Sequence, residues 1–323
     1  MKRLGIVGAG YMAENHARVA VESGRAELHV VIDIDSRRAR SLAARHGALW
    51  SCDLSAAGEL DVAIVATTTD AHAGCALPLL AAGIATMVEK PLGPDIASAA
   101  AIVHAAQRSG AVLTCGFVER FNPIVIAARA QIEDEPIHFH AVRHSPSAPR
   151  IQTSVIHDLL IHDADLAVQF ATGPVGTVTS SSWTAPGTGA VELADAVVNF
   201  QSGMIANLSA SRVGQRKVRE IRLTTPSAVV ELDLLRQDIT VYRNLRQEQN
   251  VGETINYREQ TTIDIPFVRH NGEPLALQFR HLLELIDGEH DPEDELRSLI
   301  AAHEIVDAVG SVDGPSEPLL VVG

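Results

Sequence analysis

The sequence predicts an α/β protein with a doubly wound parallel sheet, followed by an α+β domain built on a large, mainly antiparallel open sheet. A glycine-rich turn near the N-terminus lies between an apolar strand and a helix. Strand and helix periods alternate up to about residue 120, and segments with a two-residue period prevail after it. The 323 residues also exceed what one hydrophobic core usually supports. We therefore expect two domains, residues 1–121 and 122–323.

The first domain is assigned from apolar runs that alternate with helical segments. Strands of a parallel sheet are buried on both faces, so they read as continuous apolar runs. Such runs occupy residues 4–7, 28–32, 62–66, 84–88 and 112–115. Helical periodicity covers residues 14–22, 71–82 and 96–109. Right-handed crossovers place the carboxyl ends of these strands along one edge, where open α/β sheets bind ligands.

The first strand runs into Gly8-Ala9-Gly10-Tyr11-Met12-Ala13, which has the Gly-x-Gly-x-x-Ala form of a dinucleotide-binding turn. Gly8 allows the tight turn, Gly10 lets the backbone approach a pyrophosphate, and Ala13 lets helix and strand pack closely. Free N–H groups and the helix dipole favour phosphates at this end. Residues 1–121 are therefore predicted to form a Rossmann-type domain that binds its cofactor through Gly8, Gly10, Tyr11, Met12 and Ala13.

Asp33 ends the second strand, twenty residues after Ala13. At this spacing an acidic side chain is placed to accept hydrogen bonds from the adenosine ribose. Because a carboxylate repels a 2′-phosphate, the sequence favours NAD over NADP as the cofactor. Arg37 and Arg38 keep NADP possible, although solvated charges at a helix start are their simpler interpretation.

Glu89-Lys90-Pro91 follows the apolar run 84–88 and so lies at the carboxyl end of a predicted strand. Pro91 removes one backbone donor and biases Lys90 toward extended geometry, which stops the strand. A Lys-Pro pair considered alone indicates only a surface turn. Beyond the glycine turn, however, a lysine at this edge can meet both a cofactor and a substrate.

Thr67 and His72 follow the strand over residues 62–66. They are expected to face the same cofactor crevice as Glu89. Helix capping is the alternative role for this segment, and Thr69 or Asp70 is expected to cap the helix that starts there.

Period-two segments dominate the second domain, so one sheet face should be buried and the other wet or ligand-facing. Strands are expected over residues 137–142, 175–183, 196–200, 204–211, 218–224, 228–234, 239–242 and 263–267. Helices are expected over residues 124–132, 275–286 and 294–309. The Pro/Ser-rich stretch 145–154 is interpreted as a loop over the ligand site. A broad apolar sheet face is seldom left exposed to solvent in a monomer. We therefore expect a homodimer or homotetramer in which the sheets of two chains pack face to face.

Residues 155–166 are interpreted as one helix in which Asp158 and His162, four residues apart, share a face. A carboxylate beside an imidazole raises its basicity and orients it, which suits an acid/base working near neutral pH. The alternative is an ordinary ion pair on a helix face. The glycine turn upstream favours the functional interpretation.

His157, Asp163 and Asp165 lie in the same helix and could form a metal cluster. Their directions scatter around the helix, whereas metal ligands must converge on one point. We therefore predict no metal site.

Four segments together resemble the Gfo/Idh/MocA oxidoreductase family: residues 8–13, 89–91, 116–123, and Asp158 with His162. The resemblance covers nearly the whole chain. It implies that Lys90 and His162 are the catalytic lysine and histidine and that Asp158 assists them. It also implies a dehydrogenase that oxidises a secondary alcohol by hydride transfer to a nicotinamide cofactor.

Within the family, the runs 119–123, 149–151 and 230–233 are most similar to members that oxidise UDP-N-acetylglucosamine at C3. The resemblance implies a 3-keto sugar nucleotide that a partner aminotransferase uses. A free polyol or sugar, such as inositol, is the alternative substrate, and a reductase would use the same residues. A non-catalytic nucleotide-sensing regulator is a second alternative, but it would not need Lys90, Asp158 and His162 together.

In the mechanism that we expect from these positions, a carbon-bound hydrogen of the substrate moves as hydride to the nicotinamide, while the hydroxyl proton leaves to a side chain. His162 is the preferred base, oriented by Asp158. Lys90 hydrogen-bonds the reacting oxygen and stabilises developing alkoxide. His162 and Lys90 could exchange these roles.

The substrate-binding candidates are Lys90, Arg120, Arg150, Asp158 and His162. Guanidinium groups match phosphate oxygens bidentately, so Arg150 and Arg143 are candidates for holding a diphosphate. The basic pair at 216–217 is interpreted as a solvated hairpin tip. Arg120 and Asn122 are expected mainly to organise the domain junction through buried hydrogen bonds.

The formal charge of −14 opposes general binding to nucleic acid or anionic membranes. Cys52, Cys75 and Cys115 lack metal-type spacing and are interpreted as buried, reduced thiols. Reduced cysteines, together with the absence of a signal peptide and of an apolar run long enough to cross a membrane, predict a cytoplasmic protein.

Overall fold

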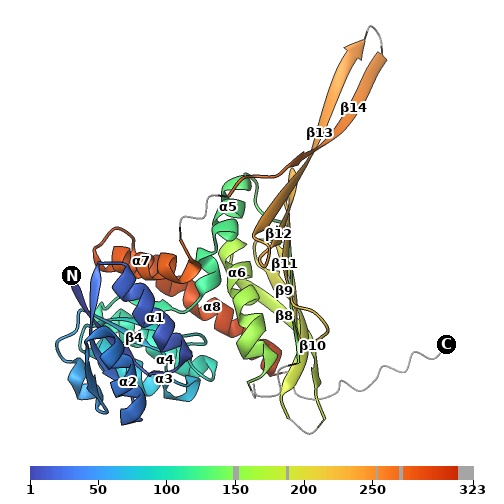
Figure 1. Cartoon of the computed structure of the whole chain (residues 1–323). Helices are drawn as coiled ribbons and strands as arrows, with labels where there is room; N and C mark the ends of the chain where they lie inside the picture. Colours follow the sequence, from blue (N-terminus) through green and yellow to red (C-terminus); the bar gives the residue numbers. More distant parts are fainter. Residues whose placement is uncertain (148–152, 187–188, 252–253, 269–271, 312–323) are drawn as a thin grey trace. The chain divides into compact units, whose positions relative to one another are not determined.

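A computed structural model of the chain describes residues 1–147, 153–186, 189–251, 254–268 and 272–311 (Figure 1). The chain forms two units that interleave along the sequence. Residues 1–131 and 266–303 make up the first unit, and residues 132–265 and 304–323 the second. The chain thus returns to the first unit near its C-terminal end, a return that the expected succession of domains 1–121 and 122–323 does not contain.

Among the described residues of the first unit, six parallel strands form a sheet in the order β3-β2-β1-β4-β5-β6. The strands are β1 (Lys2–Val7), β2 (Ala26–Ile32), β3 (Leu49–Ser51), β4 (Val62–Val65), β5 (Ala85–Val88) and β6 (Leu113–Cys115). The predicted Rossmann-type sheet is therefore confirmed, with the order reversing between β1 and β4. Only β3 was not predicted, because this short edge strand exposes Leu49 and Trp50 and lacks a buried apolar run.

The helices of this part are α1 (Tyr11–Glu22), α2 (Ser36–His46), α3 (His72–Ala81), α4 (Ile96–Ser109) and α5 (Pro123–Gln131). Asp35 and Asp95 cap α2 and α4, and accept hydrogen bonds from backbone N–H groups in the first turn. The expected cap of α3 was wrong. A short 3₁₀ turn, η2 (Thr69–Ala71), precedes that helix. The N-cap residue of α3 is Ala71, which makes no side-chain capping hydrogen bond within the described chain.

The return of the chain to the first unit adds α7 (Pro274–Ile286) and the first part of α8 (Pro292–Gly310). Phe279, Leu282 and Leu283 of α7 are buried in the same hydrophobic core as α1 and the central strands. In α8, Glu295 lies 3.0 Å from Nη1 of Arg120, which itself lies over the Phe117 ring. Both charged groups are nearly buried, so this pair closes the junction between α8 and the turn that follows β6.

The described strands of the second unit form an eight-stranded sheet in the order β14-β13-β12-β11-β7-β10-β9-β8. The strands are β7 (His138–Pro146), β8 (Val175–Thr184), β9 (Val191–Phe200), β10 (Ile205–Gly214), β11 (Val218–Thr224), β12 (Ala228–Asp233), β13 (Asp238–Val251) and β14 (Thr254–Asp264). Among these, β7 and β10 pair in parallel and the other neighbours are antiparallel. The predicted, mainly antiparallel open sheet is confirmed.

The last two strands form a long hairpin that extends beyond the rest of the sheet (Figure 1). The expected strand over 239–242 is the start of β13, but the expected strand over 263–267 was wrong, because β14 already ends at Asp264. Phe267 is 90 % exposed after that end. Residues 243–260 are mainly polar, so no apolar alternation marks them in the sequence, and backbone pairing between the two strands forms the hairpin.

One face of this sheet packs against α6 (Ile161–Phe170), which contacts β7 and β10. On that face Arg143 of β7 is held by Asp163 of α6: Nε lies 3.0 and 2.9 Å from the two carboxylate oxygens and Nη2 lies 2.7 Å from Oδ1. Both side chains are buried, 4 % and 2 % exposed. A buried, bidentate pair of this kind fixes the helix on the sheet, because separating it would leave an uncompensated interior charge.

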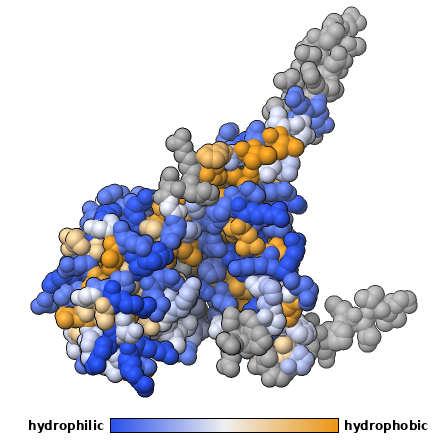
Figure 2. Space-filling model, viewed as in Figure 1, coloured by the Kyte–Doolittle hydropathy of each residue, from blue (hydrophilic) through white to orange (hydrophobic). Residues whose placement is uncertain are grey.

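The opposite face of the sheet is mainly polar across its centre. The strand register places one row of residues side by side, in the order Glu231, Arg222, His140, Asn207, Val197 and Thr179. On the side of the molecule drawn in Figure 2, which presents this sheet nearly edge-on, hydrophilic side chains prevail and hydrophobic ones form separate patches. The expectation of a broad apolar face was therefore wrong, and the homo-oligomer stays a prediction without that support.

Glu295 gives the first unit an acid-sensitive contact. Burial alone would raise the pKa of this carboxyl, but the Arg120 charge and the His281 hydrogen bond outweigh it and hold the pKa below its ordinary value of 4.5. A lowered folded-state pKa contributes stability above pH 4.5, and this contribution disappears as the pH falls through the lower folded value.

We expect Glu295→Gln to destabilise the chain at pH 7, with the difference from wild type shrinking as the pH falls below 4.5. Urea unfolding between pH 3 and pH 7, followed by circular dichroism, measures this. Glu293→Gln, an exposed position of the same helix, is the control and should follow wild type at every pH. A Glu295→Gln deficit that does not vary with pH would contradict the assignment.

Candidate functional site

The carboxyl ends of the central strands in the first unit surround a cavity of about 650 Å³. This volume suits a small ligand or cofactor. Eight of the ten residues predicted to bind a cofactor line it: Gly8, Gly10, Tyr11, Met12, Asp33, Thr67, Glu89 and Lys90. The other two, Ala13 and His72, are buried, 0 % and 1 % exposed. The sequence therefore located the wall of the cavity and two of the residues that support it.

The glycine turn has the geometry that the motif predicts. Gly8 has a φ of +99°, and a Cβ there would lie 2.4 Å from the carbonyl oxygen of Ala66. A side chain at Gly10 would meet nothing within 4 Å in the described chain, so its surroundings are open. Gly10 is the N-cap of α1 and offers no side-chain cap. The first N–H groups of the helix are therefore left for an anion such as a pyrophosphate.

Asp33 joins the glycine turn to the end of β2. Its Oδ2 accepts a hydrogen bond of 2.7 Å from Ala9 N, and its Oδ1 accepts one of 2.8 Å from Asp35 N. A carboxylate has about four acceptor positions, so capacity for ribose hydroxyl groups remains. Arg38 also lines the cavity and lies 3.6 Å from Asp35, which keeps a basic group near the ribose end.

Glu89 is bound by a residue that the sequence analysis missed. Its Oε1 lies 2.7 Å from Nε2 of His16, and its Oε2 accepts a hydrogen bond of 3.2 Å from Lys90 N. His16 is 1 % exposed and Glu89 is 8 % exposed. Gly116 makes room for this carboxylate, because a Cβ there would lie 2.6 Å from Oε2. The sequence did offer a sign of this contact, because His16 is a polar residue three positions after Ala13 and so lies on the same, buried face of α1.

Two histidines hold the turn that follows Lys90. Nδ1 of His72 donates to the carbonyl oxygen of Pro91 at 2.8 Å, and Leu92 N donates to Nε2 of His303 at 2.9 Å. The Lys90-Pro91 peptide is cis. Burial lowers the pKa of His72 against the smaller effects of its hydrogen bonds, so the ring is neutral near pH 7. His72 thus holds the turn through its hydrogen bond to Pro91. It was predicted to face the cofactor, but it is not among the residues that line the cavity.

Asp158 and His162 belong to the second unit, at the start of the helix that packs on its sheet. The expected helix over 155–166 is present, but it is not α-helical throughout. Asp158 lies in a π-helical turn, η4 (Ile156–Leu160), and His162 lies in the first turn of α6. Ser154 begins the segment, since its Oγ accepts from Ile156 N at 3.2 Å. Both predicted catalytic side chains are half-buried.

Arg212 of β10 is a second residue that the sequence analysis missed. It is 2 % exposed, and its Nη1 lies 3.6 Å from Oδ2 of Asp158. Its Nε bonds Glu192 at 3.0 Å, and its Nη2 bonds the carbonyl oxygen of Thr153. The two-residue period of β10 could have revealed it. Ala206, Leu208 and Ala210 point toward the buried face of the sheet, and Arg212 is the next residue in that series. This buried charge therefore lies within ion-pairing distance of Asp158.

Two other predicted arginines do not have the expected surroundings. Arg143, a diphosphate candidate, is buried against Asp163 as described above, so that assignment was wrong. Arg120, a substrate candidate, is paired with Glu295 inside the first unit, which favours the organising role also expected for it. Asn122 is buried, and its side chain makes local hydrogen bonds: Nδ2 donates to Glu119 at 3.1 Å and Oδ1 accepts from Ile124 N at 3.3 Å. Its role at the domain junction stays a prediction.

Arg150 and the rest of the segment 148–152 lie outside the described residues. Lys90 belongs to the first unit and Asp158 and His162 belong to the second. Their convergence on one substrate carbon stays a prediction.

The remaining expectations concern thiols, metals and membranes. The three cysteines, all within the described residues, are free thiols, but only Cys115 is buried; Cys52 is exposed and Cys75 is half-buried. Asp163 and Asp165 are buried, and Asp163 is already paired with Arg143. Among the described residues, no helix combines the length and apolarity needed to cross a membrane.

Two family models match the chain. Residues 2–117 match the oxidoreductase family model with an NAD-binding Rossmann fold, GFO/IDH/MocA, and residues 132–226 match a GFO/IDH/MocA C-terminal domain. A UDP-N-acetylglucosamine 3-dehydrogenase from Acidithiobacillus ferrooxidans is 30 % identical over 74 % of this chain and 76 % of its own length. An inositol 2-dehydrogenase from Paenarthrobacter aurescens is 29 % identical over 57 % of this chain and 58 % of its own.

A solved structure of a UDP-N-acetylglucosamine 3-dehydrogenase from Acidithiobacillus ferrooxidans has the same fold, with a TM-score of 0.81 at 26 % identity. The match covers 96 % of this chain and 98 % of that one. The dinucleotide turn, the strand order of the first sheet and both domain matches agree. The chain belongs to the GFO/IDH/MocA oxidoreductase family, and its first unit has the NAD-binding Rossmann fold of that family.

Proposed function

We propose that the chain is an NAD-dependent dehydrogenase that oxidises the C3 hydroxyl of UDP-N-acetylglucosamine or a similar UDP-sugar. The observation that carries the proposal is the position of Lys90. Lys90 lines the cavity beside the glycine turn, on a backbone that Glu89 and His72 hold in place. A cation at this point is close to both a bound dinucleotide and any alcohol presented to it.

Gly8, Gly10 and Asp33 would hold the dinucleotide, at the pyrophosphate and at the adenosine ribose. When bound, NAD accepts the hydride from the substrate carbon. The carboxylate of Asp33 disfavours a 2′-phosphate at the ribose, and we therefore propose NAD over NADP despite the nearby Arg38.

The proton of the substrate hydroxyl group would leave to a side chain of the chain itself. His162 is the proposed base, and Asp158, which lies within ion-pairing distance of Arg212, would keep the imidazole directed and basic. Lys90 would hold the substrate oxygen through its ammonium group and stabilise the charge that develops there. The exchange of roles between Lys90 and His162 remains the alternative within the same reaction.

A UDP-sugar is proposed as substrate because a relative that matches three quarters of the chain carries that name. Arg150 is the proposed diphosphate ligand, by the bidentate fit of guanidinium to phosphate oxygens. Oxidation of a free polyol is the second candidate, since inositol dehydrogenases match about half of the chain at similar identity. We further propose a cytoplasmic homodimer or homotetramer whose keto product passes to an aminotransferase.

The substrate class can be tested by following NAD reduction with a panel of UDP-sugars and free polyols. We expect turnover of UDP-N-acetylglucosamine or a close analogue and little turnover of inositol. Arg150→Ala should raise the KM for the UDP-sugar about tenfold or more, because a charged hydrogen-bonding partner is lost, and leave the KM for NAD unchanged. Turnover of polyols alone would reject the UDP-sugar and support the second candidate.

Replacement of Lys90 by Met should lower kcat by about 10²- to 10⁴-fold, the range for loss of a group that handles a proton or charge. NAD affinity, measured by calorimetry, should stay near that of wild type, because the glycine turn is intact. Lys217→Met, which removes an exposed lysine, is the matched control and should keep full activity. Normal turnover by the Lys90→Met variant would refute the catalytic assignment.

Two glycine substitutions distinguish the contribution of the turn to folding from its contribution to NAD binding. Gly8→Ala should lower both the melting temperature and the NAD affinity, because its Cβ would meet the Ala66 backbone at 2.4 Å. Gly10→Ala should weaken NAD binding about tenfold or more, yet keep the melting temperature of wild type, because its Cβ meets open space. Gly74→Ala, inside helix α3, should leave the NAD affinity unchanged and should not lower the melting temperature, because alanine favours a helix more than glycine does. Equal NAD affinity in all four proteins would exclude this turn as the binding site.

A further inference from the structure

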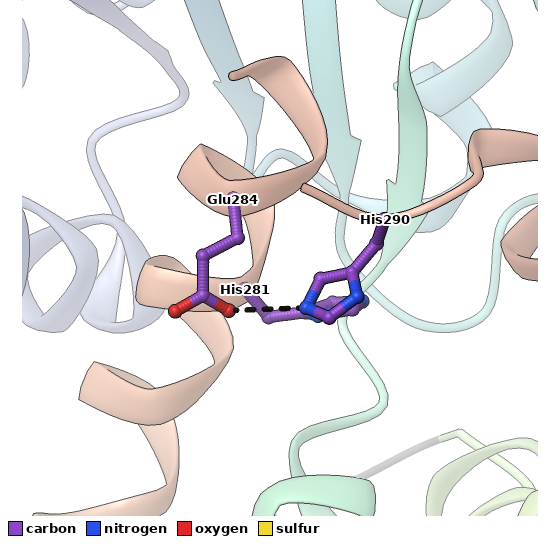
Figure 3. A group of neighbouring side chains, drawn as sticks. All are labelled: His281, Glu284 and His290. Carbon is purple, nitrogen blue, oxygen red and sulfur yellow. Dashed lines mark ion pairs between the residues drawn. The ribbon is translucent and has the colours of Figure 1, made fainter. Parts of the chain in front are cut away.

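The C-terminal end of α7 and the connection to α8 bring three ligating side chains together (Figure 3). His281 and Glu284 are three residues apart on α7 and share a face. His290 comes back toward them from the connection, and its Nε2 lies 3.5 Å from Oε2 of Glu284. One ligating atom from each residue lies within 4.8 Å of the other two. All three residues belong to the first unit, and the cavity proposed to bind the dinucleotide is lined by other residues.

The remaining contacts of these side chains leave one ligand atom on each. Oε1 of Glu284 lies 3.4 Å from Nε of Arg280, which leaves Oε2 directed to His290. Nε2 of His281 lies 3.5 Å from Oε2 of Glu295. Glu295 is in turn held by Arg120, so its position is set by a buried ion pair. A histidine that donates one ring N–H to a carboxylate has its other nitrogen oriented for a metal.

An ion pair alone accounts poorly for this cluster. His290 is 51 % exposed, and an exposed pair at this separation stabilises a protein little. The rings of His281 and His290 also lie with centroids 5.2 Å apart, which places two imidazoles side by side. Two cationic rings at this separation would repel each other, whereas two neutral rings can share one metal ion.

We propose that His281, Glu284 and His290 bind a Zn²⁺ ion. Two imidazoles and a carboxylate are ligands that zinc accepts, and an exposed His290 leaves a fourth position open to water. Ligand atoms around a tetrahedral zinc lie roughly 3.4 Å apart, so separations of up to 4.8 Å in the cluster need to contract by up to about 1.4 Å. His281 would use Nδ1, with Glu295 accepting from its Nε2. The ion would tie the connection 287–291 to the end of α7.

Zinc binding here is independent of hydride transfer and of the choice of substrate. The expected consequence is on stability, because an ion that binds the folded chain and not the unfolded one raises the melting temperature. Mg²⁺ should not replace zinc, since it prefers oxygen ligands in octahedral geometry.

The test is calorimetric titration of ZnCl₂ into the full, untagged chain after treatment with a chelator. We expect one high-affinity Zn²⁺ per wild-type chain, and at least about tenfold weaker binding in His290→Ala and in Glu284→Gln. Binding should weaken between pH 7.5 and pH 5.5, because imidazoles must be neutral to ligate. Zinc should raise the melting temperature of wild type and leave that of His290→Ala unchanged, and MgCl₂ should shift neither.

Two control variants distinguish this site from adventitious binding. His104→Ala removes an exposed histidine of α4, and Cys52→Ser removes the exposed thiol; both should bind Zn²⁺ as wild type does. Equal affinities for wild type, His290→Ala and Glu284→Gln would overturn the proposal, as would loss of binding in Cys52→Ser. Since His290 lies in an exposed connection, its replacement should leave the circular dichroism spectrum unchanged.

Discussion

The carboxylate of Glu89 connects the two parts of the first unit on which the proposed chemistry depends. One oxygen contacts His16, on the helix that starts from the glycine turn, and the other accepts from the backbone of Lys90. A nearly buried carboxylate needs such partners, and Gly116 leaves the space for it. The backbone from which Lys90 projects is therefore tied to the helix that would face the pyrophosphate. His72 and His303 hold the far side of the same turn.

Buried arginines organise the described structure where the sequence suggested ligands. Arg143 fixes α6 on its sheet through Asp163, and Arg120 closes the junction of α8 through Glu295. Arg212, which the sequence did not single out, reaches Asp158 from the sheet beneath it. Because a guanidinium has several donors and stays charged, it is stable inside a protein only with carboxylates or carbonyl groups around it. Residue type alone cannot show whether those partners come from the protein or from a substrate.

The family assignment and the geometry support different parts of the functional proposal. The domain matches and the cavity at the strand ends establish an oxidoreductase with an NAD-binding Rossmann fold. The relatives carry names of two substrate classes, a sugar nucleotide and a polyol, at similar identity. Substrate choice depends on loops and surface side chains, which vary more than the cofactor turn. The two substrate classes therefore share the cofactor turn and differ in the loops that meet the substrate.

The sequence by itself determined the parallel sheet, the glycine turn, Asp33 and the position of Lys90, because each depends on local spacing and on apolar runs buried on both faces. It also indicated that Asp158 and His162 start one helical segment. Only the tertiary structure decided the partners of His16 and Arg212, the return of α7 to the first core, and the polar hairpin β13–β14. These features rest on contacts between residues far apart in the chain or on pairing of polar backbone. Neither leaves a periodic signal in the sequence.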